Sequence, residues 1–394
     1  MKAYEETDQL IICLDGRIDS NNASAISQEI DALIKAHPGK CPSFDADGLE
    51  YISSAGLRVF LALRKRTGRK ITLFNVSLPV YDIFDTTGFT QLLDVRKKPR
   101  ELSVEGCPLI GAGACGDVYR LDDDTVVKVY HPGASSLPLI EEERSLARMA
   151  FLNGVPTAIP FDIVRVDGQW GTVFEMVKAQ SCNTILVSHP EQFPQIVEKY
   201  AELLRSVHNV TMERGTLPDS RKRYLEHLSR LKPFLSPQAF DGVKALITDL
   251  PEDLHLVHGD IHLKNVMYTD DSLMLIDMDS LGLGDPVFEF AGLFTAYIAF
   301  NEDTPDNSMD FFGLDRETCL RLFRETLCRY LGCASVPESV MDRIRLTGYL
   351  RFLSIVLSDS AAPRNETDAL RLRHSTEHLE ALWPRIQTLR LNAP

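Results

Sequence analysis

The sequence has few cysteines for its length, and those it has are not paired. Eight cysteines are scattered among 394 residues, without a C-x-x-C pair or a cluster with the spacing of a metal site. This pattern excludes a scaffold built on disulfides or zinc. We expect the thiols to be reduced and to serve mostly as packing groups.

Long apolar runs and an excess of positive charge are also missing. The longest apolar-looking run, Phe290 to Phe300, has about half of the ~20 residues that a membrane-spanning helix needs. Lys2, Glu5 and Glu6 follow the first methionine closely, so no signal peptide is expected near the start. These features predict a cytoplasmic protein without a membrane span.

The net charge of -14 and the lack of a long Lys/Arg run argue against nucleic-acid binding, since a phosphate backbone needs a basic face. A negative charge suits a cleft for a cationic substrate, although solubility is a sufficient explanation for it. Hydrophobic residues make up 44% and charged residues 25% of the chain, the balance of a globular protein. The length predicts two or three domains of roughly 100–200 residues each.

The first hundred residues alternate predicted strands and helices. A strand is expected over 10–14, and Ile26, Ile30, Leu33 and Ile34 then follow at the spacing of one helix face. That helix should end at 37–39, where proline and glycine are adjacent. A second strand up to Phe44, a helix after 53–54 and a strand over 71–74 complete a βαβα pattern, that of a small α/β layer.

Four segments of this part resemble the STAS domain of anti-sigma factor antagonists. They are Leu14-Asp-Gly-Arg-Ile-Asp19, Leu49-Glu-Tyr-Ile-Ser-Ser-Ala-Gly-Leu57, Phe74-Asn-Val76 and Phe84-Asp-Thr-Thr-Gly-Phe89. The match spans nearly all of residues 1–97. The resemblance implies a protein partner for this domain and a phosphorylation switch at Ser54, the position of the serine that a partner kinase modifies in that family. Ser53 stands where the family usually has an aspartate.

The two serines also have a simpler interpretation. A phosphoserine at a helix N-terminus meets unpaired backbone N–H groups and the positive end of the helix dipole, which favours a phosphate there. Unmodified serine is, however, a frequent helix N-cap. Regulatory phosphorylation of Ser54 and plain capping by Ser53 or Ser54 both stay open.

A glycine-rich segment follows a charged, proline-containing stretch at 96–100. Gly111, Gly113 and Gly116 form G-x-G-x-x-G. A dinucleotide site would need a helix after these glycines, but the next residues predict a hairpin with its turn at 122–124. That is the context of a kinase loop covering phosphates, where glycines let the backbone lie close to phosphate oxygens.

Lys128 lies in the second strand of this hairpin, among valines. Beside the glycine loop it is predicted to grip the phosphates of ATP, with Glu143 of the next helix holding it. A solvent-facing lysine is the alternative for Lys128, and Glu141 and Glu142 are the neighbouring candidates for its partner.

The most informative stretch is His258-Gly-Asp-Ile-His-Leu-Lys-Asn265, followed by Leu273-Met-Leu-Ile-Asp-Met-Asp279. Two carboxylates and an amide lie on loops between apolar strands, and burying such groups is unfavourable unless they bind something. The segments resemble the H-G-D-x-x-x-x-N and I-D-x-D motifs of aminoglycoside phosphotransferases, choline kinases and their relatives.

The resemblance implies a role for each matched residue. Asp260 would orient the acceptor hydroxyl and take its proton, while Asn265 and Asp277 would hold Mg²⁺ against the phosphates. Glu175 and Met176 follow a predicted strand at 172–174 and fall where the hinge between two lobes would present backbone to adenine.

The predicted fold is therefore an α/β STAS domain plus an α+β, two-lobed protein kinase-like domain with a β-rich N-lobe and a mainly helical C-lobe. The expected boundaries are 1–97 for the STAS-like domain, 98–103 for a linker, 104–178 for the N-lobe and 179–394 for the C-lobe.

The predicted activity is ATP-dependent transfer of the γ-phosphate to an alcohol group. A small-molecule acceptor is expected because Gly284-Asp-Pro286 follows Asp277 closely, which leaves no room for the long activation segment of protein kinases. Two alternatives stay open: a kinase that phosphorylates Ser54 in cis or in trans as an anti-sigma-type switch, and a non-catalytic adaptor that senses nucleotide.

Overall fold

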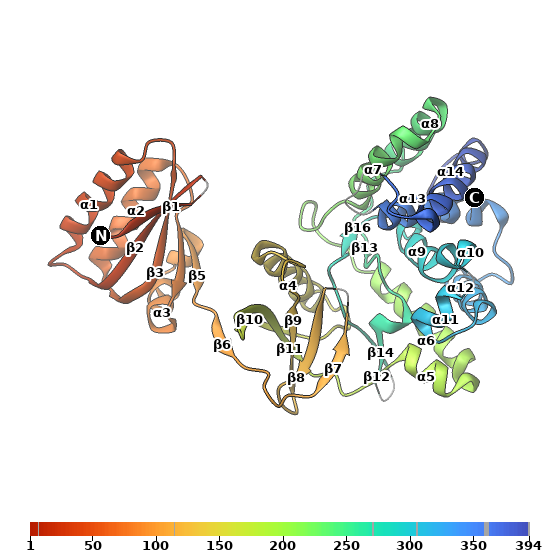
Figure 1. Ribbon diagram of the computed structural model, residues 1–394, viewed down its shortest axis with the longest axis horizontal. Coiled ribbons are helices and arrows are strands. Elements are labelled where there is room, and N and C mark those ends of the chain that lie inside the picture. Colours follow the sequence, from red (N-terminus) through yellow and green to blue (C-terminus); the bar gives the residue numbers. More distant parts are fainter. Residues whose placement is uncertain (7, 114, 270–271, 305, 358–361, 393–394) are drawn as a thin grey trace. The chain divides into compact units, whose positions relative to one another are not determined.

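The computed structural model describes residues 1–6, 8–113, 115–269, 272–304, 306–357 and 362–392. The chain groups into two units (Figure 1), of which the first comprises Met1–Ser103 and Val164–Gly168 and the second comprises Val104–Ile163 and Gln169–Pro394. Each unit is described by itself. No helix in these ranges is long and apolar enough to cross a membrane.

The first unit is built on a five-stranded sheet with the order β1-β2-β3-β4-β5. β1 is antiparallel to β2, and the other neighbours are parallel, so a helix must connect each parallel pair. The strands are β1 (Ala3–Glu6), β2 (Gln9–Ile18), β3 (Cys41–Ile52), β4 (Thr72–Val76) and β5 (Asp94–Lys97); the helices are α1 (Ala23–Ala36), α2 (Ser54–Thr67), α3 (Leu78–Thr86) and the 3-10 turn η1 (Phe89–Gln91). The α/β class predicted for this part is confirmed.

The second strand of the predicted pattern is longer than expected. β3 continues past Phe44 to Ile52, because its pairing with β2 extends to the Ile18 and Ile52 partners. α2 begins directly afterwards, and Ser53 is its N-cap. Gly56 lies where α2 meets the sheet, since a Cβ there would be 2.7 Å from the side chains of Ile18 and Ile52.

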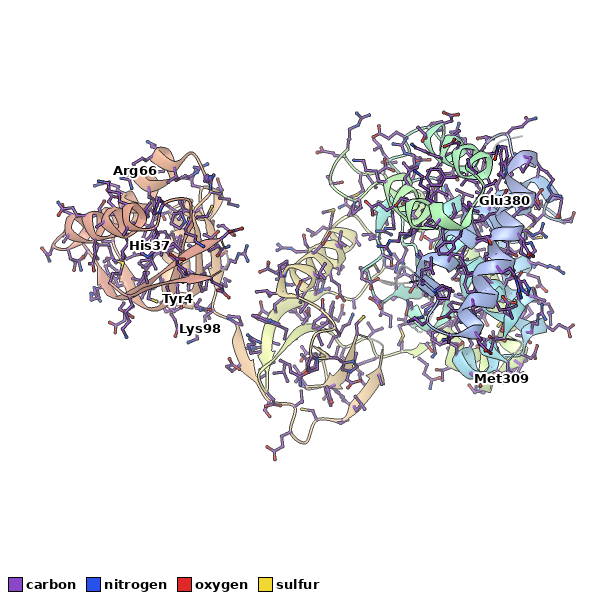
Figure 2. All side chains as sticks on the ribbon, turned by 45° about the horizontal axis from the view of Figure 1, so that its top comes forward. Tyr4, His37, Arg66, Lys98, Met309 and Glu380 are labelled. Atoms are coloured by element: carbon purple, nitrogen blue, oxygen red, sulfur yellow. The ribbon has the colours of Figure 1, made fainter. Side chains whose placement is uncertain are left out.

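The segment predicted as a linker contains a short strand. β6 (Arg100–Leu102) pairs in parallel with Val164–Val166 of β10, and both segments group with the first unit. Just before it, Lys98 (labelled in Figure 2) donates its backbone N–H to the carbonyl of Val76, and its ammonium pairs with Asp47.

The second unit starts with strands and one helix. Its strands follow the order β10-β11-β9-β8-β7, and residues 160–163 of β10 belong to this unit. The elements are β7 (Leu109–Ala112), β8 (Gly116–Arg120), β9 (Thr125–Tyr130), α4 (Leu137–Leu152), β10 (Pro160–Val166) and β11 (Gln169–Glu175). The hairpin predicted after the glycines is present, as β8 and β9 pair in antiparallel register.

The rest of this unit is mainly helical, as predicted. Its helices are α5 (Cys182–Ser188), α6 (Phe193–His208), α7 (Ser220–Leu231), α8 (Pro237–Thr248), α9 (Val287–Phe294), α10 (Phe300–Asp303), α11 (Asn307–Phe312), α12 (Arg316–Leu331), α13 (Glu338–Leu357) and α14 (Glu366–Leu382). Short strands are β12 (Gln180–Ser181), β13 (Leu256–Val257), β14 (Val266–Tyr268), β15 (Leu273–Leu275) and β16 (Gly282–Leu283). The 3-10 turns are η2 (Pro190–Gln192), η3 (Lys232–Phe234), η4 (Leu263–Asn265) and η6 (Trp383–Arg385), and η5 (Thr295–Ala299) is a π-helical turn.

Helix α9 lies at the centre of the helical part. All its residues are buried, as expected for a helix that is apolar on every side, and α13 packs against it (Figure 1). At the periphery, Glu380 of α14 accepts hydrogen bonds from the backbone N–H and the hydroxyl of Ser236, the N-cap of α8 (Figure 2). The buried α9 carries one carboxylate, Glu289, whose partners belong to the site described next.

Candidate active site

Lys128 joins three segments of the second unit. Its ammonium nitrogen Nζ lies 2.6 Å from Oε1 of Glu143 in α4 and 3.7 Å from Oδ1 of Asp277 in the loop after β15. Burial lowers the pKa of Lys128, but the carboxylates of Asp277 and Glu143 outweigh this effect and raise the pKa. Lys128 is therefore held as a partly buried cation and not as a solvent-facing side chain.

Tyr130 fixes the second oxygen of Glu143. Its hydroxyl donates to Oε2 of Glu143 at 2.9 Å and lies 3.2 Å from the hydroxyl of Thr172. The structure thus pairs Glu143, rather than Glu141 or Glu142, with Lys128.

The predicted glycine loop spans the turn between β7 and β8. Gly111 lies in β7, Gly116 begins β8, and the N–H of Gly113 donates to the carbonyl of Gly116 at 3.0 Å. A Cβ on Gly116 would collide with the carbonyl oxygen of Val129, whereas a Cβ on Gly111 would be 3.5 Å from its nearest neighbour. Close strand packing requires glycine at 116. Ala114, between these glycines, lies outside the described residues.

The side chains of two residues outside the loop bind the backbone of the loop that carries Asp260. Glu289 is fully buried and accepts the N–H of His258 at 2.7 Å and of Gly259 at 3.0 Å. Tyr200 donates its hydroxyl to the carbonyl of Ile261. Such charge-assisted and buried hydrogen bonds fix the loop and therefore the position of Asp260.

His258 braces the same loop. It is fully buried, and its Nδ1 accepts the N–H of Asp260 at 3.3 Å. Gly259, between the two, has a φ of +82°, which is a conformation that glycine adopts without strain.

The carboxylate of Asp260 contacts three side chains. Asn265 Nδ2 donates to the Asp260 carbonyl at 2.9 Å and lies 3.4 Å from Oδ2, so the two predicted residues are brought together. Arg351 Nη2 lies 3.1 Å from Oδ1, and His262 Nε2 lies 3.8 Å from Oδ2. Asp260 keeps 35% of its side-chain area exposed, so a ligand can reach it.

Asp277 and Asp279 add two more carboxylates. Asp277 has a φ of +68°, a left-handed conformation that is uncommon for non-glycine residues and that aspartate tolerates better than most. Burial raises the pKa of Asp279, and the negative charge of Asp277 raises it further. A cation at this place would relieve the repulsion between the two carboxylates.

The predicted hinge follows β11, where Glu175 is the last strand residue. Its backbone N–H donates to the Ile159 carbonyl at 2.9 Å, and the Met176 N–H donates to the Asp124 carbonyl at 2.8 Å. Met176 would therefore have to contact a nucleotide through a group other than its N–H.

Glu289 and Arg351 are among the residues of this site that were not predicted from the sequence. Glu289 offers a signal, because it is a single carboxylate within the apolar run of α9, and such a group must have buried partners. No signal in the sequence points to Arg351, because it lies 91 positions from Asp260 in a helix without a recognisable motif.

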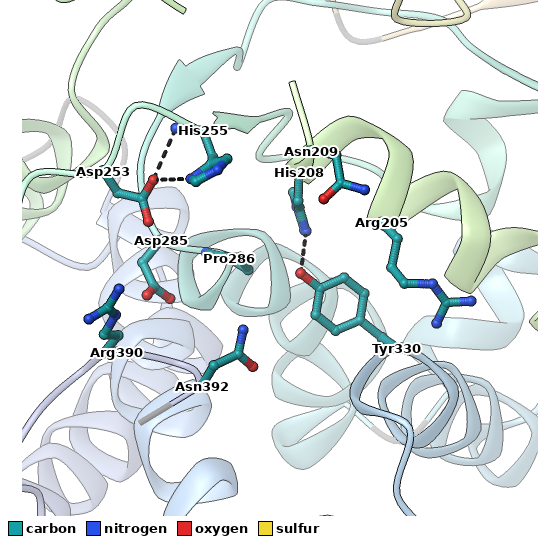
Figure 3. Close-up of a pocket in the computed structure, with 10 residues that line it drawn as sticks. All are labelled: Arg205, His208, Asn209, Asp253, His255, Asp285, Pro286, Tyr330, Arg390 and Asn392. Atoms are coloured by element: carbon teal, nitrogen blue, oxygen red, sulfur yellow. Dashed lines mark hydrogen bonds and ion pairs between the residues drawn. The ribbon is translucent and has the colours of Figure 1, made fainter. Parts of the chain in front are cut away.

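A cavity of about 410 Å³ lies in the helical part (Figure 3). On its wall, Nδ1 of His208 is 2.9 Å from the hydroxyl of Tyr330, and Nε2 of His208 lies 3.4 Å from Glu289. The cavity is lined by Arg205, His208, Asn209, Asp253, His255, Asp285, Pro286, Tyr330, Arg390 and Asn392. His208 therefore links this wall to the support of the Asp260 loop.

Comparison with protein families decides the identity of the second unit. Residues 106–323 match the model of the phosphotransferase enzyme family that includes the aminoglycoside phosphotransferases. The chain belongs to this phosphotransferase family. It is thus a phosphotransferase that acts on an alcohol group, and the sequence resemblance on which Asp260 was matched is confirmed at the level of the family.

The first unit matches the STAS domain over residues 1–102. It is 33% identical over 89 residues to the putative anti-sigma factor antagonist BtrV of Bordetella bronchiseptica, a match that covers 22% of this chain and 76% of that protein. This phosphotransferase therefore carries an N-terminal STAS domain, as its sequence predicts.

Solved structures similar to this phosphotransferase include aminoglycoside phosphotransferases. The ADP-bound APH(2'')-Ib is 16% identical with a TM-score of 0.45, and the match covers 70% of this chain and 93% of that chain. APH(3'')-Id from Streptomyces rimosus ATCC10970, in complex with ADP and streptomycin, is 18% identical with a TM-score of 0.43, covering 62% and 91%.

Proposed function

We propose that the protein transfers the γ-phosphate of ATP, bound with Mg²⁺, to a hydroxyl group of a small-molecule acceptor, under the influence of its STAS domain. The observation that carries this proposal is the position of Lys128 between Glu143 and Asp277, at 2.6 Å and 3.7 Å. A strand lysine held by a helix glutamate beside a metal-binding aspartate is the arrangement that phosphoryl transfer requires in kinase-like enzymes.

The donor set of the site fits Mg²⁺. Asn265 has its amide nitrogen engaged by Asp260, so its amide oxygen is the group to offer a cation, beside the carboxylate of Asp277. Among the described residues, no group of three or more His, Cys, Asp or Glu side chains is arranged to hold a metal. This suits Mg²⁺, which protein sites usually bind through one or two carboxylates together with substrate phosphates and water.

The residues of the chain then have distinct tasks. Bound Mg²⁺ would neutralise charge on the phosphates. Lys128 binds phosphate oxygens, and the loop of Gly111, Gly113 and Gly116 covers them. Asp260 orients the acceptor hydroxyl and takes its proton as the new O–P bond forms and the bond from the γ-phosphorus to the bridging oxygen of ADP breaks.

The proposal is tested with γ-labelled ATP, Mg²⁺ and a library of hydroxyl compounds. Wild-type protein should transfer label to a small molecule, and Asp260→Asn should reduce the rate by about 10²–10⁴-fold, the contribution typical of a general base. Asp241→Asn, at an exposed position of α8, is the control and should keep the wild-type rate. Equal turnover by wild type and Asp260→Asn would mean that Asp260 is not the base.

A second candidate function rests on Ser54. Ser53 supplies the N-cap of α2, accepting the N–H groups of Ala55 at 3.2 Å and Gly56 at 3.5 Å. Ser54 is exposed at the first turn of that helix, where a phosphate is favoured. This arrangement favours Ser54 as an acceptor, in cis or on another copy of the chain.

Intact mass after incubation with Mg-ATP separates the two candidates. Phosphate gained by wild type but not by Ser54→Ala or Asp260→Asn supports a switch that the protein applies to its own STAS domain. Full incorporation by Ser54→Ala counts against that candidate. A non-catalytic adaptor is the remaining alternative, and it requires ATP to bind without label reaching any acceptor.

A further inference from the structure

The two oxygens of the Asp260 carboxylate face different groups, a guanidinium and an imidazole whose pKa is lowered by burial. Arg351 Nη2 lies 3.1 Å from Oδ1 and His262 Nε2 lies 3.8 Å from Oδ2. The Arg351 side chain is only 13% exposed and comes from α13, which packs on the central helix α9. A partly buried arginine on the group that must meet the acceptor hydroxyl needs an explanation beyond surface pairing.

A second arginine, Arg223, lies near the loop that carries Asp260. Arg223 of α7 donates to the carbonyls of Ser280 at 2.6 Å and Leu281 at 3.3 Å, and its Nη1 lies 3.6 Å from the position of a Cβ on Gly259. Burial lowers the pKa of Arg223, and the positive charge of Arg351 lowers it further. The two guanidinium groups therefore lie close enough to repel each other.

The carboxylate of Asp279 partly offsets the charge of Arg223, and His227, one turn after Arg223 on α7, adds no charge of its own. Burial, Arg351 and Arg223 together lower its pKa to about 3, so it is a neutral side chain at physiological pH. On the loop itself, His262 packs edge-on against Phe311, and Lys264 Nζ lies 4.1 Å above the same ring. Phe311 is exposed, so this aromatic surface and its lysine are accessible.

An acceptor hydroxyl must come within about 2.6–3.2 Å of the Asp260 carboxylate. Arg351 already donates to one of these oxygens, so an acceptor that also offers an anion gives the guanidinium a second partner at close range. Arginine binds carboxylate and phosphate through its planar fork of donors. A cationic group of the acceptor placed beside Arg351 would instead meet a like charge.

We propose that the acceptor is a hydroxyl compound carrying an anionic group, carboxylate or phosphate, and that Arg351 binds this group and thereby sets acceptor specificity. This inference rests on the proposed function, because it concerns the acceptor of that reaction. It argues against a cationic acceptor, which was one interpretation of the negative net charge.

The test compares acceptors that differ in charge but little in size, using the full chain, Mg²⁺ and γ-labelled ATP. One series is glycerol, glycerate, glycerol 3-phosphate and 3-amino-1,2-propanediol; the other is glucose, gluconate, glucose 6-phosphate and glucosamine. The small-molecule fraction of a cell extract, divided on an anion-exchange column, extends both series. We expect kcat/KM to be at least about 10-fold higher for anionic members, and the carboxylate and phosphate members identify which anion is preferred.

Variants separate specificity from support of Asp260. Arg351→Gln should raise KM for the anionic acceptor by about 10- to 100-fold, the effect of losing one charged hydrogen bond, while KM for ATP changes little. Arg351→Lys, which keeps the charge, should recover part of the loss. Arg345→Gln on the same helix, where Arg345 pairs with Asp342, is the matched control and should keep wild-type acceptor kinetics.

Each remaining outcome is decisive. Preferential labelling of neutral or cationic compounds overturns the inference and leaves the phosphotransferase proposal standing. An equal fall in kcat for every acceptor in Arg351→Gln, without a change in acceptor KM, assigns Arg351 to holding Asp260 and also overturns it. Label transfer to no compound and no extract fraction refutes the small-molecule phosphotransferase proposal itself.

Discussion

Replacing Glu289 by glutamine should destabilise the second unit and misplace Asp260. The wild-type carboxylate accepts the N–H groups of His258 and Gly259 at 2.7 Å and 3.0 Å, and it is completely buried. Glutamine has nearly the same shape, but it offers one acceptor oxygen and turns an NH₂ group toward the other donor.

The magnitude follows from these contacts. One hydrogen bond to a charged acceptor, worth about 1.5–3 kcal/mol, is lost, and a buried N–H is left without an acceptor at a cost of about 1–3 kcal/mol. Because the two contributions overlap, we expect the free energy of unfolding to fall by about 2–4 kcal/mol. Since the affected loop carries Asp260, kcat should fall by about 10- to 100-fold, as a displacement of up to an ångström produces.

The difference in free energy of unfolding between wild type and Glu289→Gln should depend on pH. Burial raises the pKa of Glu289, but its interactions with His208 and His258 outweigh burial and lower the pKa below its ordinary value of 4.5. The ionised carboxylate therefore stabilises the folded state fully above about pH 4.5, and this stabilisation is lost as the pH falls through the lower folded-state pKa. The gap between wild type and Glu289→Gln should narrow toward acid pH.

Denaturant unfolding followed by tryptophan fluorescence measures the effect. Both tryptophans of the chain, Trp170 and Trp383, belong to the second unit, so the signal reports on that unit. Glu377→Gln, at an exposed position, is the control and should change the free energy of unfolding by less than about 0.5 kcal/mol. Unchanged stability and unchanged kcat in Glu289→Gln at pH 7 would refute the reasoning.

Three further predictions concern other parts of the chain. Gly116→Ala should lower the free energy of unfolding by about 1–3 kcal/mol and raise KM for ATP, because a Cβ there collides with backbone. Gly111→Ala, where a Cβ would be 3.5 Å from its nearest neighbour, should change the free energy of unfolding by less than about 1 kcal/mol. Equal losses of stability in the two variants would contradict this packing argument. Ser53→Ala should reduce the protection of the α2 amides in hydrogen exchange by about 0.5–2 kcal/mol, since it removes the N-cap. Ser54→Ala should change this protection by less than about 0.5 kcal/mol. A larger loss of protection in Ser54→Ala than in Ser53→Ala would show that Ser54 is the cap. Asp277→Asn should lower kcat/KM by about 100-fold or more at limiting Mg²⁺. The measurement is the rate over a titration with Mg²⁺. If the dependence of the rate on Mg²⁺ is the same as in the wild type, Asp277 is not a metal ligand.

The sequence by itself determined the two kinds of domain and the local geometry of the motifs. The apolar spacing of 26–34 and the proline and glycine after it predicted α1, because helix periodicity and helix-ending residues act over a few positions. The strand pattern around Lys128 likewise predicted the hairpin and excluded a dinucleotide-binding helix. These features depend on neighbours in sequence, so they can be read without knowledge of the fold.

Only the tertiary structure decided which distant groups meet. Glu143 was predicted as the partner of Lys128 with its two neighbouring glutamates as alternatives, and the pairing itself depends on how α4 packs against the sheet. Arg351 lies 91 positions from Asp260, and its contact depends on the packing of α13 against the buried α9. Packing and electrostatics act through space, so the basic surroundings of Asp260, and with them the charge expected of the acceptor, follow from the folded chain and not from its order of residues.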